Sequence, residues 1–496
     1  MDAASALEAR IDTLSVLESE LESLGSSAKV YKQKTSTPIY FRSTKAAVKS
    51  ETNSELARLK SGRKIDGLLT LQRESSSMSP EAVLSSVKVP LMVLLAVLNL
   101  QYVIIQSSVR YLLYGSRAAS WNYSTNIARD LIYYIANQNG KASGGLLYKA
   151  SSIYWQKFSS WPRIFGINTG YPSITTTIDI PSYPISGAVL QASWHWAEKL
   201  SNMSAEAVSS NKTLYAECIA AKNSQVDNIF DTGTACGPTN NHEMAILYFH
   251  GGGYVSCTLD TYRKLRTRLA AVSGLPVYAV EYGLAPQFKY PSQLYDAYCA
   301  FRYMLTNLGF SSRNIIIAGD SAGGNLALGL WQLIRNETPP RALLLLSPRV
   351  DISYTRESWH TNADVDYLQP EAALDPNSSI YKLLVSSNTT SVVVDDIQRE
   401  IQSLVLDPYL APVHANLSNL PPTLIQVGKS ETMFSDIHEF SKRAISSVQQ
   451  NKGEGPVVFQ VFSGAFHVFQ ISPFTIPELD DAWDKIGAFI QSLQTR

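Results

Sequence analysis

Two glycine-rich motifs, each at the end of a short apolar run, constrain this chain more than any other feature. The motif His-Gly-Gly-Gly-Tyr at 250–254 follows the run 244–249, and Gly-Asp-Ser-Ala-Gly-Gly-Asn at 319–325 follows the run 314–318. A G-x-S-x-G between a strand and a helix makes a turn so tight that only small residues fit at its glycines, and it exposes the serine hydroxyl. The second motif therefore predicts a nucleophile, Ser321, at the end of a sheet.

The first motif predicts the groups that would stabilise the product of a serine attack. Backbone N–H groups of such a glycine loop, together with the N–H that follows the serine, bind the negative oxygen that forms during acyl transfer. The predicted donors are chiefly Gly252 and Gly253, with Gly251 beside them, and Ala322 after the serine. The two motifs together predict a serine hydrolase that acts on acyl groups.

A serine hydroxyl is a weak nucleophile at neutral pH and needs a base that is itself oriented by an acid. In proteins with this elbow the chain order is serine, acid, histidine. The chain has seven histidines, and among those after Ser321 only His467 follows the last predicted strand. Two acids follow the strand at 423–427: Glu431, which is nearer the strand end and is favoured, and Asp436. Asp436 opens a helical pattern, where a carboxylate has an ordinary role near the helix N-terminus.

Apolar runs and helical patterns alternate from about residue 240 onward. This alternation predicts a mostly parallel sheet with helices on both faces. The predicted strands are 244–249, 276–281, 314–318, 342–346, 423–427 and 457–461, and the predicted helices are 261–272, 295–308, 325–335, 435–450 and 479–493. Two long aromatic-rich segments, 125–240 and 352–412, do not fit the alternation and are predicted to be caps over the site.

Charge and cysteine content narrow the function further. Lys+Arg and Asp+Glu are both 42, which argues against a nucleic-acid partner because such a partner needs a basic face. The four cysteines lack the spacing of a zinc site, and the predicted chemistry needs no metal or organic cofactor. Cys218 and Cys236 are candidates for a disulfide in an oxidising compartment, and the sequence leaves that pairing open.

The first part of the chain differs from the rest. Leucines and one isoleucine from Leu7 to Leu24 recur at helical spacing and predict a short amphipathic helix. The segment 26–88 is polar and is predicted to be largely disordered. The apolar run Val89–Ile105 is near the length that spans a bilayer, where ~20 residues are usual. It predicts either a signal-anchor helix or a helix packed on the enzyme.

Two observations favour the anchor. Basic residues precede the run, and the positive-inside tendency then keeps the N-terminus cytoplasmic. Glycosylation acceptor motifs (N-x-S/T) all lie after the run, at Asn122, Asn202, Asn211, Asn336, Asn377, Asn388 and Asn416. The predicted organisation is a polar tail at 1–88, a membrane anchor at 89–110, a cap and the N-terminal part of the catalytic domain at 111–240, and a catalytic core at 241–496 with a cap insertion around 352–412.

The motifs together resemble the hormone-sensitive-lipase-like branch of the α/β-hydrolases, whose markers are HGGG and GDSAGGN. The resemblance extends to Tyr-Gly-Leu-Ala-Pro at 282–286, where the family usually has Tyr-Arg-Leu-Ala-Pro-Glu, and to Phe-His-Val-Phe-Gln at 466–470. Gly283 and Gln287 stand in place of the family's Arg and Glu. The resemblance implies an α/β-hydrolase fold with a helical cap.

Within that branch, the N-terminal anchor and the segments 345–351 and 366–368 resemble fungal steryl acetyl hydrolases. This resemblance implies a single-pass protein of the endoplasmic reticulum membrane, with its catalytic domain in the lumen, that deacetylates lipophilic esters such as sterol acetates. Two alternatives are a broad-specificity esterase or lipase for xenobiotics, and an inactive hydrolase fold that only binds. The presence of a serine, an acid and a histidine argues against the second.

Overall fold

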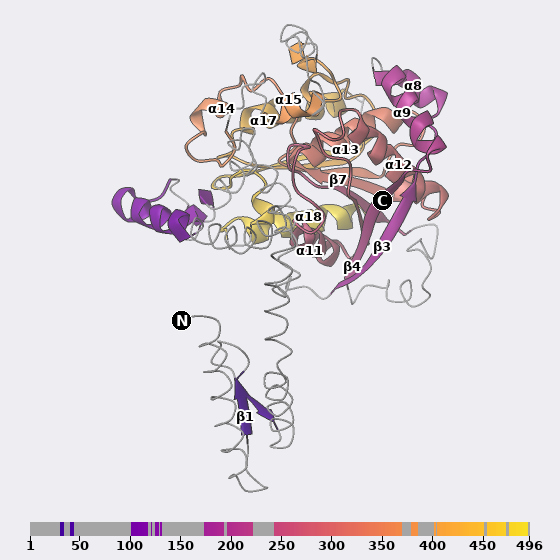
Figure 1. The fold of residues 1–496 in the computed structure, drawn as a ribbon. Coiled ribbons are helices and arrows are strands. Elements are labelled where there is room, and N and C mark those ends of the chain that lie inside the picture. Colours follow the sequence, from indigo (N-terminus) through magenta and orange to yellow (C-terminus); the bar gives the residue numbers. More distant parts are fainter. Residues whose placement is uncertain are drawn as a thin grey trace, which may run out of the picture. The chain divides into compact units, whose positions relative to one another are not determined.

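The computed structural model describes residues 30–33, 40–43, 101–117, 121, 125–127, 129–130, 173–192, 196–221, 243–369, 378–384, 401–402, 404–450, 454–472 and 476–494 (Figure 1). The chain divides into two units, residues 1–99 and 100–496. In the first unit, strands β1 (Val30–Gln33) and β2 (Tyr40–Ser43) pair antiparallel within the tail predicted to be disordered. Their aromatic and β-branched residues favour extended backbone. The helix predicted over 7–24 lies outside the described residues.

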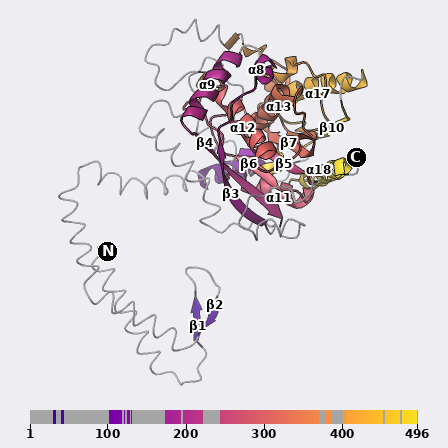
Figure 2. The same cartoon turned by 90° about the vertical axis from the view of Figure 1, so that its right-hand side faces the viewer.

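An eight-stranded sheet forms the centre of the second unit (Figure 2). Its order is β10-β9-β8-β7-β5-β6-β4-β3. The strands are β3 (Ser173–Pro181), β4 (Thr213–Ala221), β5 (Ala245–Phe249), β6 (Val277–Val280), β7 (Ile315–Asp320), β8 (Ala342–Leu346), β9 (Thr423–Gly428) and β10 (Val457–Phe462). All neighbours from β10 to β6 pair parallel, whereas β4 pairs antiparallel with β6 and with β3. The predicted, mostly parallel sheet is confirmed.

Strands β3 and β4 lie within the segment 125–240, where the sequence pattern predicted no specific strand. They pair over nine residues each, from Ser173 opposite Ala221 to Pro181 opposite Thr213. Threonines and an aspartate interrupt the apolar residues of β3, because an edge strand presents one face to solvent. The periodicity is therefore weaker than that of the buried parallel strands. These two strands of the segment therefore extend the sheet.

Helices cover both faces of the sheet (Figure 1). Strand β5 illustrates the two faces: Leu247 and Phe249 belong to one buried cluster, and Ile246 and Tyr248 to the other. The first cluster includes residues of α8 (Gly187–Ala192), α9 (Ala197–Ser209), α12 (Ser292–Thr306), α13 (Ser321–Ile334) and α17 (Phe434–Gln449). The second includes residues of α11 (Arg263–Ser273) and α18 (Leu479–Gln494).

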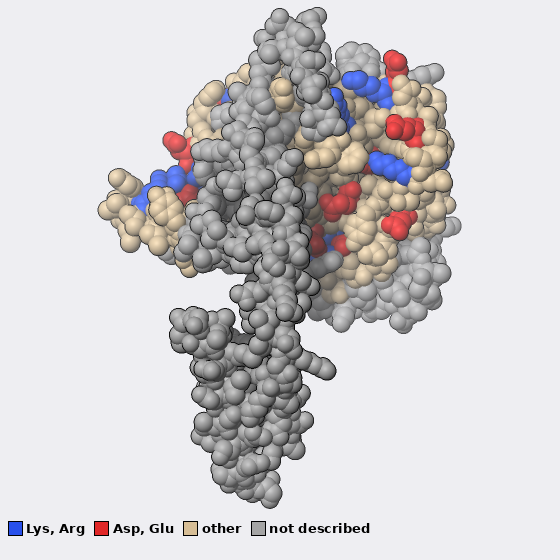
Figure 3. All heavy atoms as spheres, viewed as in Figure 1, with Lys and Arg blue, Asp and Glu red and all other residues tan. Residues whose placement is uncertain are grey.

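Shorter elements complete the described chain. They are α14 (Ser358–Thr361), α15 (Ser379–Leu384) and the 3-10 turns η2 (Ser312–Asn314), η3 (Pro412–His414) and η4 (Phe469–Ile471). Residues 101–114 are helical, and no helix of the described residues is long and apolar enough to cross a membrane. Residues 89–100 of the predicted anchor lie outside the described ranges. On the face shown in Figure 3, acidic and basic side chains of the described residues are intermingled.

Candidate active site

Ser321 sits at a sharp turn between β7 and α13. Its φ is +50°, in the left-handed region that residues other than glycine rarely adopt. A Cβ on Gly319 would lie 2.3 Å from the carbonyl oxygen of Gly323, and a Cβ on Gly323 would lie 2.0 Å from that of Phe249. The backbone thus permits only glycine at both positions, as the elbow motif requires. Helix α13 begins at Ser321, four residues before the predicted start at 325. The prediction began late because Gly323 and Gly324 weaken the helical pattern, although Gly323 is needed for this close packing.

The predicted triad residues lie within hydrogen-bond distance of one another. His467 Nε2 is 2.8 Å from Ser321 Oγ, and His467 Nδ1 is 2.9 Å from Glu431 Oε2. Glu431 follows β9, and His467 follows β10. The exposed fractions are 9% for Ser321, 2% for His467 and 0% for Glu431. The arrangement has the order and contacts of a base held between a nucleophile and an acid.

The carboxylate of Glu431 is oriented by two further donors. Its Oε1 accepts hydrogen bonds from Ser347 Oγ at 2.6 Å and from the Gly428 N–H at 2.5 Å, which leaves Oε2 toward the imidazole. Ser347 Oγ in turn accepts the Val468 N–H at 3.2 Å. Sequence reasoning missed Ser347, which lies 84 positions before Glu431 and has no local signal.

The alternative acid, Asp436, makes different contacts. It lies in the first turn of α17, and its Oδ2 accepts a hydrogen bond from Trp359 Nε1 at 2.7 Å. Arg356 Nε lies 3.2 Å from Oδ1 of the same carboxylate and 3.5 Å from Asp351 Oδ2. Burial and the neighbouring Asp351 raise the pKa of Asp436 to about 7. Of the two candidate acids, the structure therefore brings only Glu431 to His467.

Several buried charges act on His467. Burial alone lowers the pKa of the imidazole, but the hydrogen bond to Glu431 and the negative charges of Glu431, Asp366 and Asp320 outweigh burial and raise that pKa. The protonated imidazole is therefore stabilised in a nearly dry environment. This is the state that a general base reaches once it has taken the serine proton.

The glycine loop has the geometry of an anion-binding site. Gly252 and Gly253 have φ values of +107° and +66°. Among the described residues, no acceptor takes the N–H of Gly252, Gly253 or Ala322. The Gly251 N–H, in contrast, donates to Asp320 Oδ1 at 3.0 Å. The structure therefore gives Gly251 a different role from the predicted one, because its N–H is already bonded.

Asp320 is a second residue that sequence reasoning missed, although it lies inside the elbow motif. It is fully buried and accepts hydrogen bonds from the hydroxyls of Tyr248 and Tyr262, the latter at 2.8 Å, besides the Gly251 N–H. Burial raises the pKa of Asp320 to about 6 despite these donors. The ring of His250 in the same loop is also buried, and burial lowers its pKa to about 4, so it is neutral at pH 7.

The described residues bear only in part on the predictions about metals and the disulfide. Within the described ranges, no group of three or more His, Cys, Asp or Glu side chains is arranged to hold a metal ion. Cys218 lies buried in β4, and Cys236 lies outside the described residues, so a bridge between them stays a prediction.

Comparison with known proteins agrees with this architecture. Residues 246–471 match the family described as alpha/beta hydrolase fold. An esterase of Acinetobacter venetianus is 32% identical over 250 residues, which cover 50% of this chain and 75% of that protein. Esterase LipU of Mycobacterium tuberculosis is 27% identical over 313 residues, 63% of this chain and 97% of that protein. An acetyl-hydrolase of Streptomyces hygroscopicus is 29% identical over 257 residues, 51% of this chain and 78% of that protein.

A solved structure shares the fold. The crystal structure of an esterase from the bacterial hormone-sensitive lipase family has a TM-score of 0.50 and 22% sequence identity, and the match covers 74% of this chain and 98% of that chain. The sheet and its elbow serine define the class of α/β hydrolases. The chain belongs to the alpha/beta hydrolase family, is hormone-sensitive-lipase-like in its motifs, and is a carboxylic ester hydrolase.

Proposed function

We propose that this protein hydrolyses small lipophilic esters with Ser321 as nucleophile, His467 as base and Glu431 as acid. The observation that carries the proposal is the continuous series of contacts from Glu431 through His467 to Ser321, at 2.9 and 2.8 Å. A buried glutamate that orients the imidazole and a serine in a strained turn are the arrangement that acyl transfer needs.

The reaction proceeds in two halves. His467 Nε2 takes the Ser321 proton as Oγ bonds to the ester carbonyl carbon, and the carbonyl electron pair moves onto oxygen. The N–H groups of Gly252, Gly253 and Ala322 donate to that oxyanion, and losing one such donor costs about 3 kcal/mol of transition-state stabilisation. Collapse breaks the bond to the alcohol, which leaves with the proton from His467. Water, deprotonated by the same imidazole, then releases the acid and restores Ser321.

We propose acetyl esters of sterols as the favoured substrates. The segments 345–351 and 366–368 support this proposal through their resemblance to fungal steryl acetyl hydrolases, and one relative is named an acetyl-hydrolase. A broader esterase is the second candidate, because other relatives are named esterase or carboxylesterase. The two candidates are distinguished by measuring the turnover of three substrates at the same enzyme concentration: a sterol acetate, aryl esters of increasing acyl length, and a triacylglycerol.

We also propose that a helix within 89–110 anchors the protein in the endoplasmic reticulum membrane, with the catalytic unit in the lumen. Large apolar side chains on the described helix 101–114 support attachment, because they are strongly exposed: 60% for Ile105, 80% for Leu112 and 68% for Leu113. Such a surface is costly in water and is typical of a membrane or protein contact. It continues the apolar run that begins at Val89.

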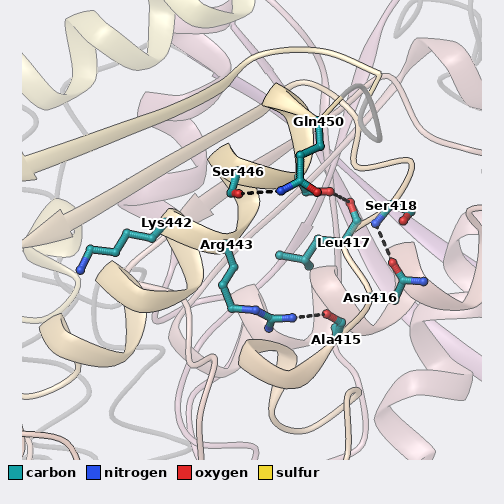
Figure 4. Close-up of a pocket in the computed structure, with 9 residues that line it drawn as sticks. Ala415, Asn416, Leu417, Ser418, Lys442, Arg443, Ser446 and Gln450 are labelled. Carbon is teal, nitrogen blue, oxygen red and sulfur yellow. Dashed lines mark hydrogen bonds between the residues drawn. The ribbon is translucent and has the colours of Figure 1, made fainter.

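Asn416 is accessible for the glycosylation that a luminal location would allow. It is exposed beside an open hollow of about 430 Å³ between the segment 415–418 and α17 (Figure 4). Its Oδ1 accepts the Ser418 N–H at 2.9 Å, so the acceptor motif forms a turn at the surface. None of the residues lining this hollow belongs to the triad or to the glycine loop.

The catalytic proposal is tested with Ser321→Ala in the full chain. We expect loss of turnover of a chromogenic short-acyl ester, together with loss of labelling by a fluorophosphonate probe, while the thermal melting curve stays that of a folded protein. Retained hydrolysis by a folded Ser321→Ala protein would refute the mechanism. A wild-type protein that is folded but neither labelled nor active would favour the binding-only alternative.

A further inference from the structure

A carboxylate outside the triad connects the loop that carries the acid with the loop that carries the histidine. Asp366, in the insertion between β8 and β9, is fully buried. Its Oδ1 accepts the backbone N–H of His467 at 3.1 Å. Its Oδ2 accepts both the N–H of Thr432 at 2.8 Å and the Thr432 hydroxyl at 3.1 Å. Because Thr432 follows Glu431 directly, one side chain contacts both loops.

Asp366 is itself held firmly by its surroundings. Its backbone N–H donates to the carbonyl oxygen of Asn362 at 2.8 Å, and Arg129 Nη2 donates to the Asp366 carbonyl oxygen at 2.6 Å. The Asn362 amide donates to the carbonyl oxygen of Glu431 at 2.7 Å. The Tyr367 ring lies 5.8 Å from the imidazole of His467. The segment 362–367 therefore packs against the acid loop and the histidine at several points.

Charged groups reach His467 from three elements. Glu431 comes from the loop after β9, Asp320 from the end of β7 and Asp366 from the insertion, and all three carboxylates favour the protonated imidazole. Among the described residues, the hydroxyl of Ser321 also contacts the imidazole, and the ring of Tyr367 lies near it. A negative charge at Asp366 thus acts on His467 in addition to fixing its backbone.

We propose that Asp366 is a positioning residue for the hydrolysis. It fixes the spacing between the loop that carries Glu431 and the loop that carries His467, and it places a negative charge beside His467 in addition to that of Glu431. This inference rests on the proposed triad. It differs from a purely structural role because the same carboxylate that accepts the N–H groups of His467, Thr432 and Tyr367 also acts electrostatically on the base.

The test is Asp366→Asn in the full-length protein, with kcat and KM for a short-acyl aryl ester measured across pH. In either orientation of the new amide, its NH₂ group faces the N–H of His467 or the N–H of Thr432, so one of them loses its acceptor. We expect kcat to fall about 10- to 100-fold with little change in KM, as misplacement of a reacting group does. We also expect the acidic limb of the pH profile to move to lower pH, because the negative charge is lost.

The matched control is Asp364→Asn, which removes an exposed carboxylate two positions away and should leave both kcat and the pH profile unchanged. If Asp366→Asn does not fold, Thr432→Val serves instead, since it removes one hydrogen bond to Asp366 and keeps the charge. We expect Thr432→Val to lower kcat without moving the acidic limb.

A folded Asp366→Asn protein with the wild-type pH profile would overturn the inference, and so would a Thr432→Val protein with wild-type kcat. The proposed function would survive both outcomes as long as Ser321→Ala is inactive. Absence of esterase activity in the folded wild-type protein would instead overturn the proposed function. The two failures are therefore distinguishable.

Discussion

Gly251 donates its backbone N–H to Asp320 Oδ1 across 3.0 Å, and this hydrogen bond joins the glycine loop to the residue before the elbow serine. Because Gly252 and Gly253 follow directly, the bond sets where their N–H groups lie relative to Ser321. Asp320 thus ties together the two motifs that stand apart in the sequence, and both tyrosine hydroxyls that donate to it reinforce the connection.

Asp320→Ala should lower kcat for an aryl ester about 100-fold, because the glycine loop loses its acceptor and moves relative to Ser321. Asp320→Asn should retain far more activity, since its amide oxygen still accepts the Gly251 N–H and the Tyr262 hydroxyl can rotate to accept from the NH₂ group. Steady-state kinetics on both folded variants checks this. Equal activity of the two variants would contradict the positioning role.

Glu431→Gln should lower kcat by about 10³- to 10⁴-fold, as loss of the negative acid does in other serine triads. Asp436→Asn should leave kcat near the wild-type value, because Asp436 contacts Trp359 and Arg356 rather than the imidazole. The measurement is kcat at the optimal pH for the two folded variants. The reverse pattern would assign the acid role to Asp436.

Asp436 should make stability depend on pH in a defined direction. Its pKa is raised from the ordinary 3.8 to about 7 in the folded state. At a pH between these two values, the folded protein therefore binds a proton at Asp436 that the unfolded chain does not bind. The carboxyl therefore destabilises the fold above pH 7, and this cost disappears as the pH falls toward 4.

Urea unfolding of wild type and Asp436→Asn at pH 5 and pH 8 measures this effect. The difference in unfolding free energy between the variant and wild type should be more favourable to the variant at pH 8 than at pH 5, by on the order of 2 kcal/mol. Asp481→Asn, which neutralises an exposed carboxylate, serves as the control and should show no such change. A pH-independent difference for Asp436→Asn would show that Arg356 keeps the carboxylate charged throughout.

Asn416→Gln should remove one glycan if the catalytic unit is luminal, because the side chain is exposed and its motif forms a surface turn. The expected result is a faster-migrating band than wild type, with the difference abolished by glycosidase, and retention of both proteins in membranes after alkaline carbonate extraction. Unchanged mobility of the wild type after glycosidase, together with release by carbonate, would refute the luminal anchor.

The sequence by itself predicted the parts of this protein whose signal is local. The glycines of the elbow follow from the turn they must make, and the buried parallel strands appear as continuous apolar runs because both of their faces are covered. Chain order then singled out His467, and proximity to a strand end favoured Glu431 over Asp436. The predicted bounds of the core strands agree with the structure to within two residues.

Only the tertiary structure decided which groups surround these residues. Strand β4 joins the sheet through antiparallel pairing with β6, and β3 joins through antiparallel pairing with β4, although the half-exposed pattern of β3 is weak in the sequence. Asp366 reaches the His467 N–H across 101 positions of the chain, and Gly251 reaches Asp320 across 69. Such contacts depend on how the strand ends converge in space, and the spacing of residues along the chain carries no record of that convergence.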